Sequence, residues 1–353
     1  MKSGDDWTKS EAGPGEEPEF DRALRPKRLE DFVGQQQLRQ NLEIAIRAAQ
    51  QRQEPLDHIL FCGPPGLGKT TLAFLIAREM GTQVVVSSGP SLASPKDLVG
   101  TLTRLATGDV FFLDEIHRVP RTVEEFLYSA MEDQAIDITI DQGPAARSIR
   151  LPLAAFTLVG ATTREGLLAA PFRNRFGITE RLQPYPENDL IAIVERASRL
   201  YGYGTSPEAA ALIAARSRGV PRVALRLFRR LRDFAQVAGL EQLSYESAGQ
   251  GLAALGVDEL GLEGLDREIL NVLCQRGGQA VGLKTLAACV GESEDTIEAV
   301  HEPHLLRLGL LSRTPRGRVP TGRAFAHLGL PLAPGCLLEN EDGSIQTQLD
   351  FES

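Results

Sequence analysis

The sequence lacks the features that mark membrane-spanning, secreted or disulfide-rich proteins. No apolar run approaches the roughly 20 residues of a membrane-spanning helix, and the first twenty residues are acidic and polar, unlike a signal peptide. The chain has only four cysteines, whose spacing matches neither a metal site nor a disulfide framework. They fit reduced thiols in the cytoplasm. We therefore expect a cytoplasmic protein that does not enter a membrane.

The chain also lacks the positive charge of many nucleic-acid-binding proteins, since its net charge is -9. However, residues 1–20 carry six acidic and two basic side chains, and residues 331–353 carry five acidic and no basic ones. These two tails account for the whole net charge, so residues 21–330 are neutral overall and can still present basic patches to phosphates. The tails are polar with little apolar periodicity, and we expect them to be disordered.

Between the tails, the sequence pattern predicts three folded parts. From 21 to 185, apolar strand-like runs alternate with helical patterns, which is typical of an α/β fold with a parallel sheet. Residues 186–256 have apolar residues at helical spacing and include a strongly basic helix over 222–235. Residues 259–330 combine short helices with an Arg-rich hairpin, which favours a winged helix. The predicted sheet strands are Ile59–Cys62, Val84–Val86, Val110–Leu113 and Phe156–Val159.

A phosphate-binding motif follows the first predicted strand. Residues 63–70 read GPPGLGKT, the Walker A pattern, between a buried strand and the start of a helix. Glycines there let backbone N–H groups surround phosphates, and the helix N-terminus adds positive partial charge. The alternative, a chance Gly-rich turn, does not explain the flanking strand and helix. The motif predicts ATP bound by Gly66, Gly68, Lys69, Thr70 and Thr71, with the Thr70 hydroxyl on Mg²⁺.

Two carboxylates end the third predicted strand. Asp114 and Glu115 directly follow four buried-type apolar residues, at the end of a strand where α/β sheets bind ligands. We expect Asp114 to hold Mg²⁺ and Glu115 to polarise the attacking water. A solvated acidic loop is the alternative. Thr163 follows the fourth strand, where a hydroxyl can sense the γ-phosphate, although threonine is also an ordinary strand residue.

Two further arginines are candidates for contacts with the nucleotide. In a ring ATPase, an arginine in the segment 173–177 would project into the neighbouring subunit's site as an arginine finger. We prefer Arg175 to Arg173 because it directly precedes Phe176-Gly177. Arg222 opens the basic helix and is expected to reach the γ-phosphate from a lid. For both arginines, a solvated side chain is the alternative.

Residues 135–151 interrupt the alternation of strands and helices. Isoleucines alternate with polar residues from 136 to 140, and Gly143-Pro144 forms a turn before a second run, which predicts a β-hairpin with one apolar face. Ile138 and Ile149 on that face are candidates for docking a protein partner. The alternative is that they belong to the core.

The C-terminal hairpin concentrates three guanidinium groups within six residues, Arg313, Arg316 and Arg318, with no acid among them. Such a cluster suits phosphate contacts, which hold DNA without reading its sequence. Arg316 and Arg318 are two positions apart and would share a face if the hairpin were regular there, while Arg313 precedes Pro315, where we expect the chain to turn. A solvated basic loop is the alternative. The helix over 296–308 has few basic residues, which favours the wing as the DNA contact.

Beyond the Walker motifs, specific segments occur along residues 21–330. They are LRP at 24–26, FVGQ at 32–35, DH at 57–58, LDEIHR at 113–118, AMED at 130–133, GPAARSI at 143–149, GATTR at 160–164, RFGI at 175–178 and RTPRGR at 313–318. In these segments, the chain resembles the RuvB family, bacterial Holliday junction branch migration ATPases of the AAA+ type. The hairpin and wing segments are the most specific of them.

The resemblance implies an AAA+ P-loop domain, a small helical lid and a winged-helix domain. It implies that Leu24 and Arg25 line the adenine end of the pocket, that Glu132 and Asp133 lie close to the nucleotide, and that Tyr185 borders it. It favours Arg313 and Arg318 as the phosphate contacts. The implied partners are duplex DNA at Holliday junctions, a RuvA-like protein on the 135–151 hairpin, a RuvC-like resolvase and a homo-oligomeric ring, expected to be a hexamer. The implied roles are recombination, DNA repair and the SOS response.

Two other functions remain open from the residues alone. A clamp-loader-like ATPase would use ATP to open a protein partner, and an ATP-switched DNA-binding regulator would turn over little nucleotide. The hairpin that follows the strand ending in Asp114 and Glu115, together with the Arg-rich wing, favours the branch migration motor. Glu115 and Arg175 argue against a pure switch, because a switch needs neither a water-polarising acid nor an arginine finger.

Overall fold

The computed structural model describes residues 24–140, 147–332, 337–339 and 345–347, and it divides into two compact units, Met1–Gln183 and Pro184–Ser353. The expected acidic tail at 1–20, most of the tail at 331–353, Cys336 and the Gly143-Pro144 turn lie outside the described residues. Within the described part, no helix is long and apolar enough to cross a membrane.

The first unit is built on a five-stranded parallel sheet with the order β2-β3-β6-β1-β7. The four predicted strands are confirmed, the last one shifted by one residue and extended. The fifth strand was not predicted, because it is short and its residues alternate between half-buried and exposed, as on the edge of a sheet. The strands are β1 Ile59–Cys62, β2 Val84–Ser88, β3 Val110–Asp114, β6 Thr157–Thr162 and β7 Ile178–Arg181.

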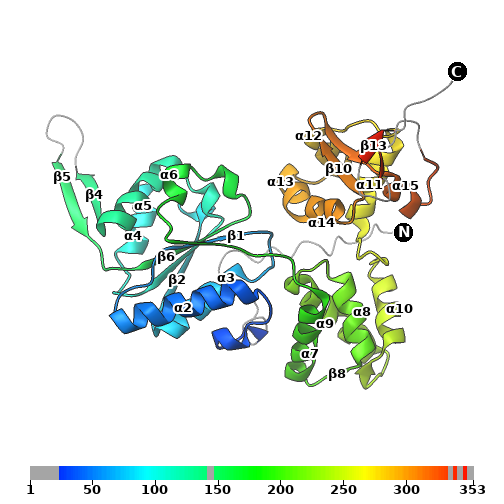
Figure 1. The fold of residues 1–353 in the computed structure, drawn as a ribbon, viewed down its shortest axis with the longest axis horizontal. Coiled ribbons are helices and arrows are strands. Elements are labelled where there is room, and N and C mark those ends of the chain that lie inside the picture. Colours follow the sequence, from blue (N-terminus) through cyan, green and yellow to red (C-terminus); the bar gives the residue numbers. More distant parts are fainter. Residues whose placement is uncertain (1–23, 141–146, 333–336, 340–344, 348–353) are drawn as a thin grey trace. The chain divides into compact units, whose positions relative to one another are not determined.

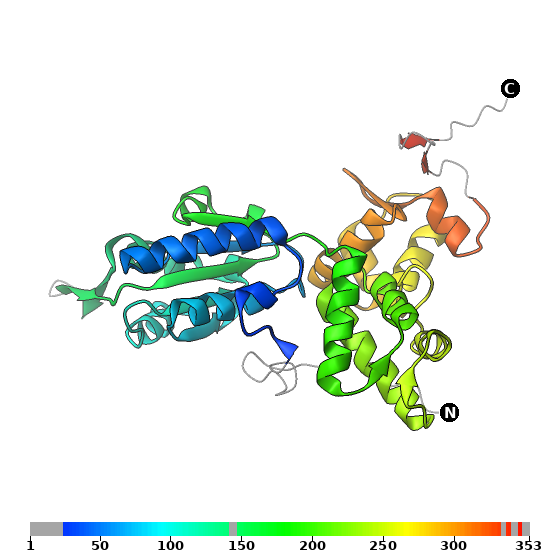
Figure 2. The same ribbon diagram turned by 60° about the horizontal axis from the view of Figure 1, so that its bottom comes forward.

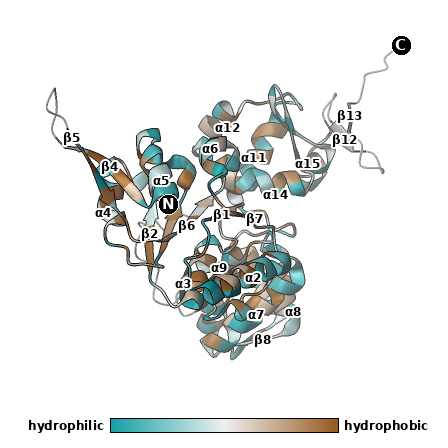
Figure 3. Cartoon of the chain, turned by 60° about the vertical axis from the view of Figure 1, so that its left-hand side comes forward, coloured by the Kyte–Doolittle hydropathy of each residue, from teal (hydrophilic) through white to brown (hydrophobic). Residues whose placement is uncertain are grey.

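Helices cover both faces of this sheet. In Figure 1, α2 and α3 are drawn below the sheet and α5 and α6 above it, and Figure 3 colours β2 and β6 as hydrophobic. One core joins Phe111 and Leu158 of the strands to Leu127 of α5 and Phe172 of α6. The helices and 3-10 turns are η1 Leu29–Asp31, α2 Gln36–Arg52, α3 Lys69–Met80, η2 Gly89–Ser91, α4 Pro95–Leu102, η3 Ile116–Arg118, α5 Arg121–Asp133, η4 Glu165–Leu167 and α6 Ala170–Arg173.

The predicted β-hairpin is present as β4 (Ala135–Ile140) and β5 (Arg147–Pro152), which project from this unit in Figure 1. Ile138 and Ile149 are cross-strand partners, so their side chains lie on the same face. Ile138 is half-buried and packs against the core, whereas Ile149 is 50% exposed. The apolar face is therefore divided between a part that packs inward and a part that faces solvent.

The second unit begins with four helices. Helix α9 confirms the predicted basic helix, and its buried residues recur every three or four positions, from Ala224 through Phe228 to Ala235. Its arginines occupy the remaining positions, so the helix packs through one stripe and presents positive charge elsewhere. The elements are α7 Glu187–Tyr201, β8 Gly204–Thr205, α8 Pro207–Arg216, α9 Pro221–Val237, β9 Gln242–Leu243 and α10 Tyr245–Ala254.

The same unit ends in a helical cluster with a two-stranded wing, visible in Figure 2, around a core that includes Leu270, Leu286, Leu305 and Phe325. The predicted helix over 296–308 contains a π turn just before Pro303, whose missing N–H prevents regular α-helical hydrogen bonding. The elements are α11 Gly264–Gln275, α12 Leu283–Val290, α13 Glu294–Thr296, η5 Ile297–His301, α14 Glu302–Arg307, β10 Leu311–Thr314, β11 Gly317–Pro320, α15 Gly322–His327, β12 Leu337–Glu339 and β13 Ile345–Thr347.

Candidate nucleotide site and Arg-rich wing

The predicted phosphate loop joins β1 to α3. Gly63 has φ +135° and Gly68 has φ +105°, both conformations that side chains disfavour. A Cβ on Gly63 would also lie 2.7 Å from the carbonyl oxygen of Leu182. The glycines are therefore required by the backbone path, and α3 begins at Lys69 with its N–H groups directed at the loop.

Lys69 is buried inside this loop. Its Nζ donates hydrogen bonds to the carbonyl oxygens of Gly63 at 2.7 Å and Pro64 at 2.8 Å. Burial lowers the pKa of Lys69 to about 8, although the charges of Asp114 and Glu115 oppose this shift. The ammonium is thus held where the loop would enclose phosphates, and an anion bound there would stabilise its charged form. Thr70 and Thr71 follow it, both half-buried.

The order of the strands brings the other predicted groups to the same edge of the sheet. Strand β6 lies between β3 and β1, and all three are parallel. Asp114 at the end of β3, Thr163 after β6 and Lys69 after β1 therefore emerge side by side. Burial raises the pKa of Asp114, against the lowering effect of the Glu115 N–H, which donates to Asp114 Oδ1 at 2.9 Å, and of the Lys69 charge. A divalent cation would stabilise this desolvated carboxylate, so the residues fit a Mg²⁺ site.

The side chains around Glu115 include two residues that the sequence reasoning missed. Arg118 Nη1 lies 2.9 Å from Glu115 Oε2, in a pair that is about half-exposed. His117 Nδ1 lies 3.0 Å from the hydroxyl of the buried Thr162, which also accepts the Arg164 N–H. The three-residue spacing of Glu115 and Arg118 on a 3-10 turn was the available signal. The Thr162 hydroxyl already has these partners. Thr163, the next residue, is half-buried and stays the candidate for a contact with the γ-phosphate.

Arg175 folds back onto α5 of its own chain. Its guanidinium lies 3.1 Å from Glu132, 4.4 Å from the centre of the Tyr128 ring, and donates to the Pro171 carbonyl oxygen at 2.7 Å. Its Nε is buried without a partner among the described residues. Arg173, the alternative candidate, lies 3.9 Å from Glu165. Arg175 is thus pre-ordered by neighbours of its own chain, while its Nε–H has no partner among the described residues.

Other residues expected near the nucleotide lie in both units. Arg25 places its guanidinium 4.6 Å from the centre of the Phe74 ring on α3, with the half-buried Leu24 before it. Asp133 pairs with Arg150 of the hairpin at 2.9 Å.

In the second unit, the backbone N–H of the buried Tyr185 donates to the Gly219 carbonyl oxygen at 2.8 Å. This contact ties the start of the unit to the loop before α9. Arg222 is exposed in the first turn of that helix.

The wing places Arg313 and Arg318 opposite each other as cross-strand partners, with Arg316 exposed in the turn between β10 and β11. The hairpin is not regular at Arg316, so the condition under which Arg316 and Arg318 would share a face is not met. Pro315 and Arg316 form a two-residue turn, so the alternation stops at Thr314 and resumes at Gly317. The pairing of Arg313 with Arg318 brings both to one side of the wing, and their contact with phosphates stays a prediction.

Both paired arginines contact one buried carboxylate. Arg318 Nη2 lies 3.0 Å from Glu302 Oε2, and Arg313 Nε also pairs with Glu302, whose side chain is 1% exposed. Burial alone would raise the pKa of Glu302, but hydrogen bonds from Arg313 and Arg318 hold it below its ordinary value. The Arg318 side chain is 14% exposed and that of Arg313 is 49% exposed. Arg313 and Arg316 are therefore the more accessible cations of the wing.

Comparisons with known proteins match nearly the whole described chain. Residues 24–182 match the Holliday junction DNA helicase RuvB P-loop domain, residues 185–258 the RuvB AAA lid domain, and residues 259–329 the RuvB C-terminal winged helix domain.

Relatives with assigned names agree with these matches. The Holliday junction branch migration complex subunit RuvB 1 of Synechococcus sp. (strain JA-3-3Ab) is 54% identical over 90% of this chain and 84% of its own. The corresponding subunit RuvB of Treponema pallidum (strain Nichols) is 52% identical over 91% of this chain and 92% of its own.

The solved structure of the Thermotoga maritima RuvB Holliday junction branch migration motor is similar in fold. It has a TM-score of 0.81 and 44% identity, covering 88% of this chain and 99% of that one. The parallel sheet with flanking helices, the AAA lid and the winged helix are therefore this chain's fold, as predicted. On these matches, the chain belongs to the RuvB family, P-loop ATPases of the AAA+ type, a membership that implies nucleotide binding.

Proposed function

We propose that this protein is an ATP-driven motor that forms a ring on duplex DNA and drives branch migration of Holliday junctions in recombination, DNA repair and the SOS response. The observation that carries the proposal is the common sheet edge of Lys69, Thr163, Asp114 and Glu115, in a RuvB-family chain that also has an Arg-rich wing. The proposed domains are the ATPase domain at 21–185, the lid at 186–256 and the winged helix at 259–330. The spacing of the four cysteines, which matches neither a metal site nor a disulfide framework, supports a cytoplasmic location.

ATP binding rests on the phosphate loop. The N–H groups of Gly66, Gly68 and the start of α3 surround the phosphates, and Lys69 exchanges its two carbonyl contacts for phosphate oxygens. Thr70 and Asp114 would hold Mg²⁺, which when bound neutralises charge on the phosphates. Two protein ligands suit this ion, because Mg²⁺ keeps several waters. Thr71 completes the phosphate contacts.

Hydrolysis needs a positioned water molecule. Glu115 orients and polarises this water, and Thr163 contacts the γ-phosphate from the neighbouring strand. Glu115 is paired with Arg118 in the single chain, and a half-exposed pair of this kind is weak enough to open. The carboxylate therefore changes partners at little cost when substrate is present.

A ring supplies the remaining contacts. Arg175 acts in trans on the nucleotide of a neighbouring subunit. Its contact with Glu132 keeps its guanidinium ordered at the interface between the two subunits. Glu132 and Asp133 lie close to the nucleotide at this interface. Leu24 and Arg25 line the adenine end, while Tyr185 and Arg222 approach the nucleotide from the lid. We propose a closed ring, because it gives every site an arginine finger, and the family resemblance implies that the ring is a hexamer.

The partners follow from the hairpin and the wing. The exposed Ile149 on the 135–151 hairpin docks a RuvA-like junction-binding protein, and a RuvC-like resolvase acts at the same junction. Arg313, Arg316 and Arg318 contact DNA phosphates without reading bases. A clamp loader or a nucleotide-operated switch is the competing function. ATP turnover stimulated more by a four-way junction than by linear duplex supports the motor, and equal or absent stimulation contradicts it.

The roles of Lys69 and Glu115 separate binding from hydrolysis. Lys69→Ala should lose ATP binding, because it removes the cation that contacts ground-state phosphates. Glu115→Gln should bind ATP normally but turn it over about 10²–10⁴-fold more slowly, the usual contribution of a positioned general base. A fluorescent ATP analogue and a phosphate-release assay measure the two quantities. Glu125→Gln on the exposed part of α5 serves as the control, and wild-type turnover by Glu115→Gln would rule out the assigned role.

The finger in trans is tested by mixing two inactive proteins. Arg175→Ala should retain ATP binding and lose hydrolysis by about 10³-fold or more. Adding Lys69→Ala subunits, which still carry the finger, should restore part of the turnover, because mixed interfaces combine an intact site with an intact Arg175. Arg173→Ala is the matched control and should stay active alone. No recovery at any mixing ratio would assign Arg175 to its own subunit's site or to folding.

The hairpin face separates docking from packing. Ile149→Asp should leave the melting temperature and the DNA-independent ATPase unchanged but abolish junction loading with a RuvA-like partner, because this side chain is half-exposed. Ile136→Asp, at a position 1% exposed, should lower the melting temperature instead, since it buries a charge. Calorimetry and a gel-shift assay with the partner distinguish the two. Early melting of Ile149→Asp would show that this residue belongs to the core.

The wing is tested by the salt dependence of DNA binding. Arg316→Ala should weaken binding about equally on unrelated sequences and flatten the slope of log affinity against log salt by about 0.9, without changing the melting temperature. Arg318→Ala should flatten the slope similarly but also destabilise the fold, because it leaves Glu302 buried with a single arginine. Fluorescence anisotropy over a salt series is the measurement. Unchanged slopes, or a loss confined to one sequence, would exclude a phosphate clamp.

A further inference from the structure

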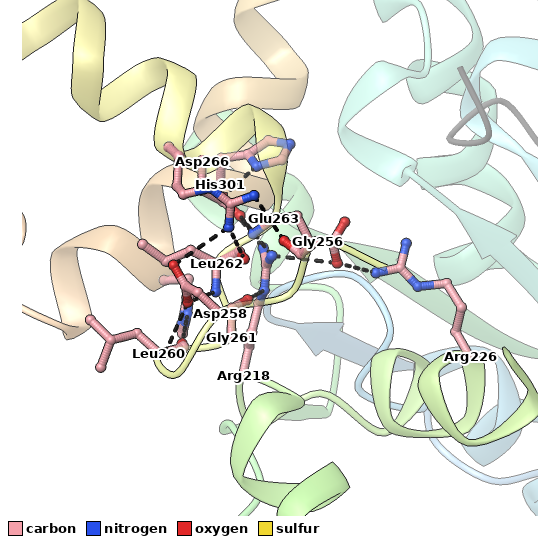
Figure 4. Close-up of polar contacts among 12 residues, drawn as sticks. Arg218, Arg226, Gly256, Asp258, Leu260, Gly261, Leu262, Glu263, Asp266 and His301 are labelled. Atoms are coloured by element: carbon pink, nitrogen blue, oxygen red, sulfur yellow. Dashed lines mark hydrogen bonds and ion pairs between the residues drawn. The ribbon is translucent and has the colours of Figure 1, made fainter. Parts of the chain in front are cut away.

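Arg218 occupies an unusual position in the loop between α8 and α9. Its backbone has φ +59°, in the left-handed region that few residues other than glycine adopt, and the residue is only 9% exposed. Figure 4 shows its side chain reaching toward residues 261–266, at the start of the winged-helix part of the same unit. A charged residue that is both buried and strained is kept in place by its surroundings.

Those surroundings are a set of polar partners from the winged-helix part. The Arg218 guanidinium pairs with both oxygens of Asp266, the closer at 2.6 Å, and lies 3.4 Å from Glu263. Its Nε donates to the Gly261 carbonyl oxygen at 2.9 Å, and its own carbonyl oxygen accepts from Arg307 of α14. Side chain and backbone of one loop residue are therefore fixed by two different helices, α11 and α14.

The contacts continue from Asp266 to the wing. Asp266 is completely buried, and it also lies 2.7 Å from Nδ1 of His301 and accepts the backbone N–H of Glu263 at 2.8 Å. His301 directly precedes Glu302, the buried carboxylate that pairs with Arg313 and Arg318. On the other side, Arg218 lies four residues before Arg222 in the sequence. Buried ion pairs and hydrogen bonds thus lead from the loop before α9 to His301, the neighbour in sequence of the carboxylate that holds the wing arginines.

This cluster constrains geometry more than it adds stability. Burying two charges costs desolvation energy that their attraction often only offsets, and apolar residues of similar size would stabilise the same junction as well. Hydrogen bonds from a guanidinium to both oxygens of one carboxylate and to a carbonyl oxygen, however, fix direction as well as distance. The loop before α9, and with it the first turn of that helix, therefore has little freedom to rotate against α11.

We propose that Arg218 is a positioning residue that holds α9 and the winged helix rigidly against each other. DNA bound at the wing then changes the rate of ATP turnover through Arg222. The inference rests on the proposed function, because it needs a nucleotide phosphate at Arg222 and DNA at the wing. Loosening the Arg218–Asp266 contact leaves each end able to bind its ligand but removes the communication between them.

The test compares two variants of the contact with a matched control. Asp266→Asn removes the nearer of the two carboxylate charges that Arg218 faces, and Arg218→Lys keeps the positive charge but loses the planar set of donors. Asp258→Asn is the control, because Asp258 holds the same linker through the N–H groups of Leu260 and Leu262 and through His327 without touching Arg218. ATP turnover without DNA, duplex affinity by anisotropy, the stimulation of turnover by duplex DNA and the melting temperature are measured on the full chain.

Both contact variants should keep unstimulated turnover and duplex affinity close to wild type, while stimulation by duplex falls about fivefold or more, a usual size for coupling between two sites. Asp258→Asn should keep the stimulation of turnover by duplex DNA, even if its melting temperature falls as far as those of the two contact variants. Full stimulation in Arg218→Lys and Asp266→Asn would overturn the inference, and so would an equal loss in Asp258→Asn. If Asp266→Asn does not fold, Arg218→Lys decides. Wild-type protein without any DNA stimulation would instead contradict the proposed function itself.

Discussion

The parallel register of β3, β6 and β1 is the constraint on which the nucleotide site depends. Because the carboxyl ends of parallel strands meet at one edge, a lysine after β1 and an aspartate after β3 become neighbours although 45 positions separate them in the sequence. Burial then works against both charges, lowering the pKa of Lys69 and raising that of Asp114. Each charge partly offsets the desolvation of the other. The edge is therefore poised to accept a phosphate and a cation together.

Arginine–carboxylate pairs recur at several places in the structure. The exposed pairs can open, which suits a residue that must change partners, whereas the buried pairs stay fixed. Arg118 and Glu115 are both about half-exposed, so their pair contributes little and opens readily. Glu302 and Asp266 are almost fully buried, so removing Arg218 leaves Asp266 without its arginine, and removing Arg318 leaves Glu302 with only Arg313. Partner exchange is therefore suited to the proposed catalytic residues at the sheet edge, and fixed geometry to the wing and to the loop before α9.

The sequence predicted those parts of the fold in which local pattern and final environment agree. Buried strands such as Ile59–Cys62 are continuous apolar runs, and the wing carries a Pro-Arg turn between short strands, so both were predictable. Strand β7 was missed because an edge strand buries only one side and needs no apolar run. Counting every second residue along the sequence does not show that Arg313 and Arg318 share a face. A two-residue turn lies between them, and the alternation of side chains does not continue through it.

The candidate site was predictable to a similar extent and for similar reasons. Lys69, Asp114 and Glu115 belong to motifs whose chemistry is local, so their identity is readable from spacing. The partners of Arg218 lie 45 and 48 positions away, and nothing in the local sequence distinguishes this arginine from its solvated neighbours on α9. Only the folded chain brings it to Asp266.

The placement of the second unit's functional residues has a mechanical consequence. Tyr185, Arg222 and the wing arginines all belong to one compact unit, and the loop before α9 is held by Tyr185 through Gly219 and by Asp266 through Arg218. A displacement of that loop is therefore passed to both the start of the unit and the winged helix. In a motor of the proposed kind, a nucleotide sensed at Arg222 would move the DNA-binding surface with it, because the contacts between them are buried, directional and already formed in the single chain.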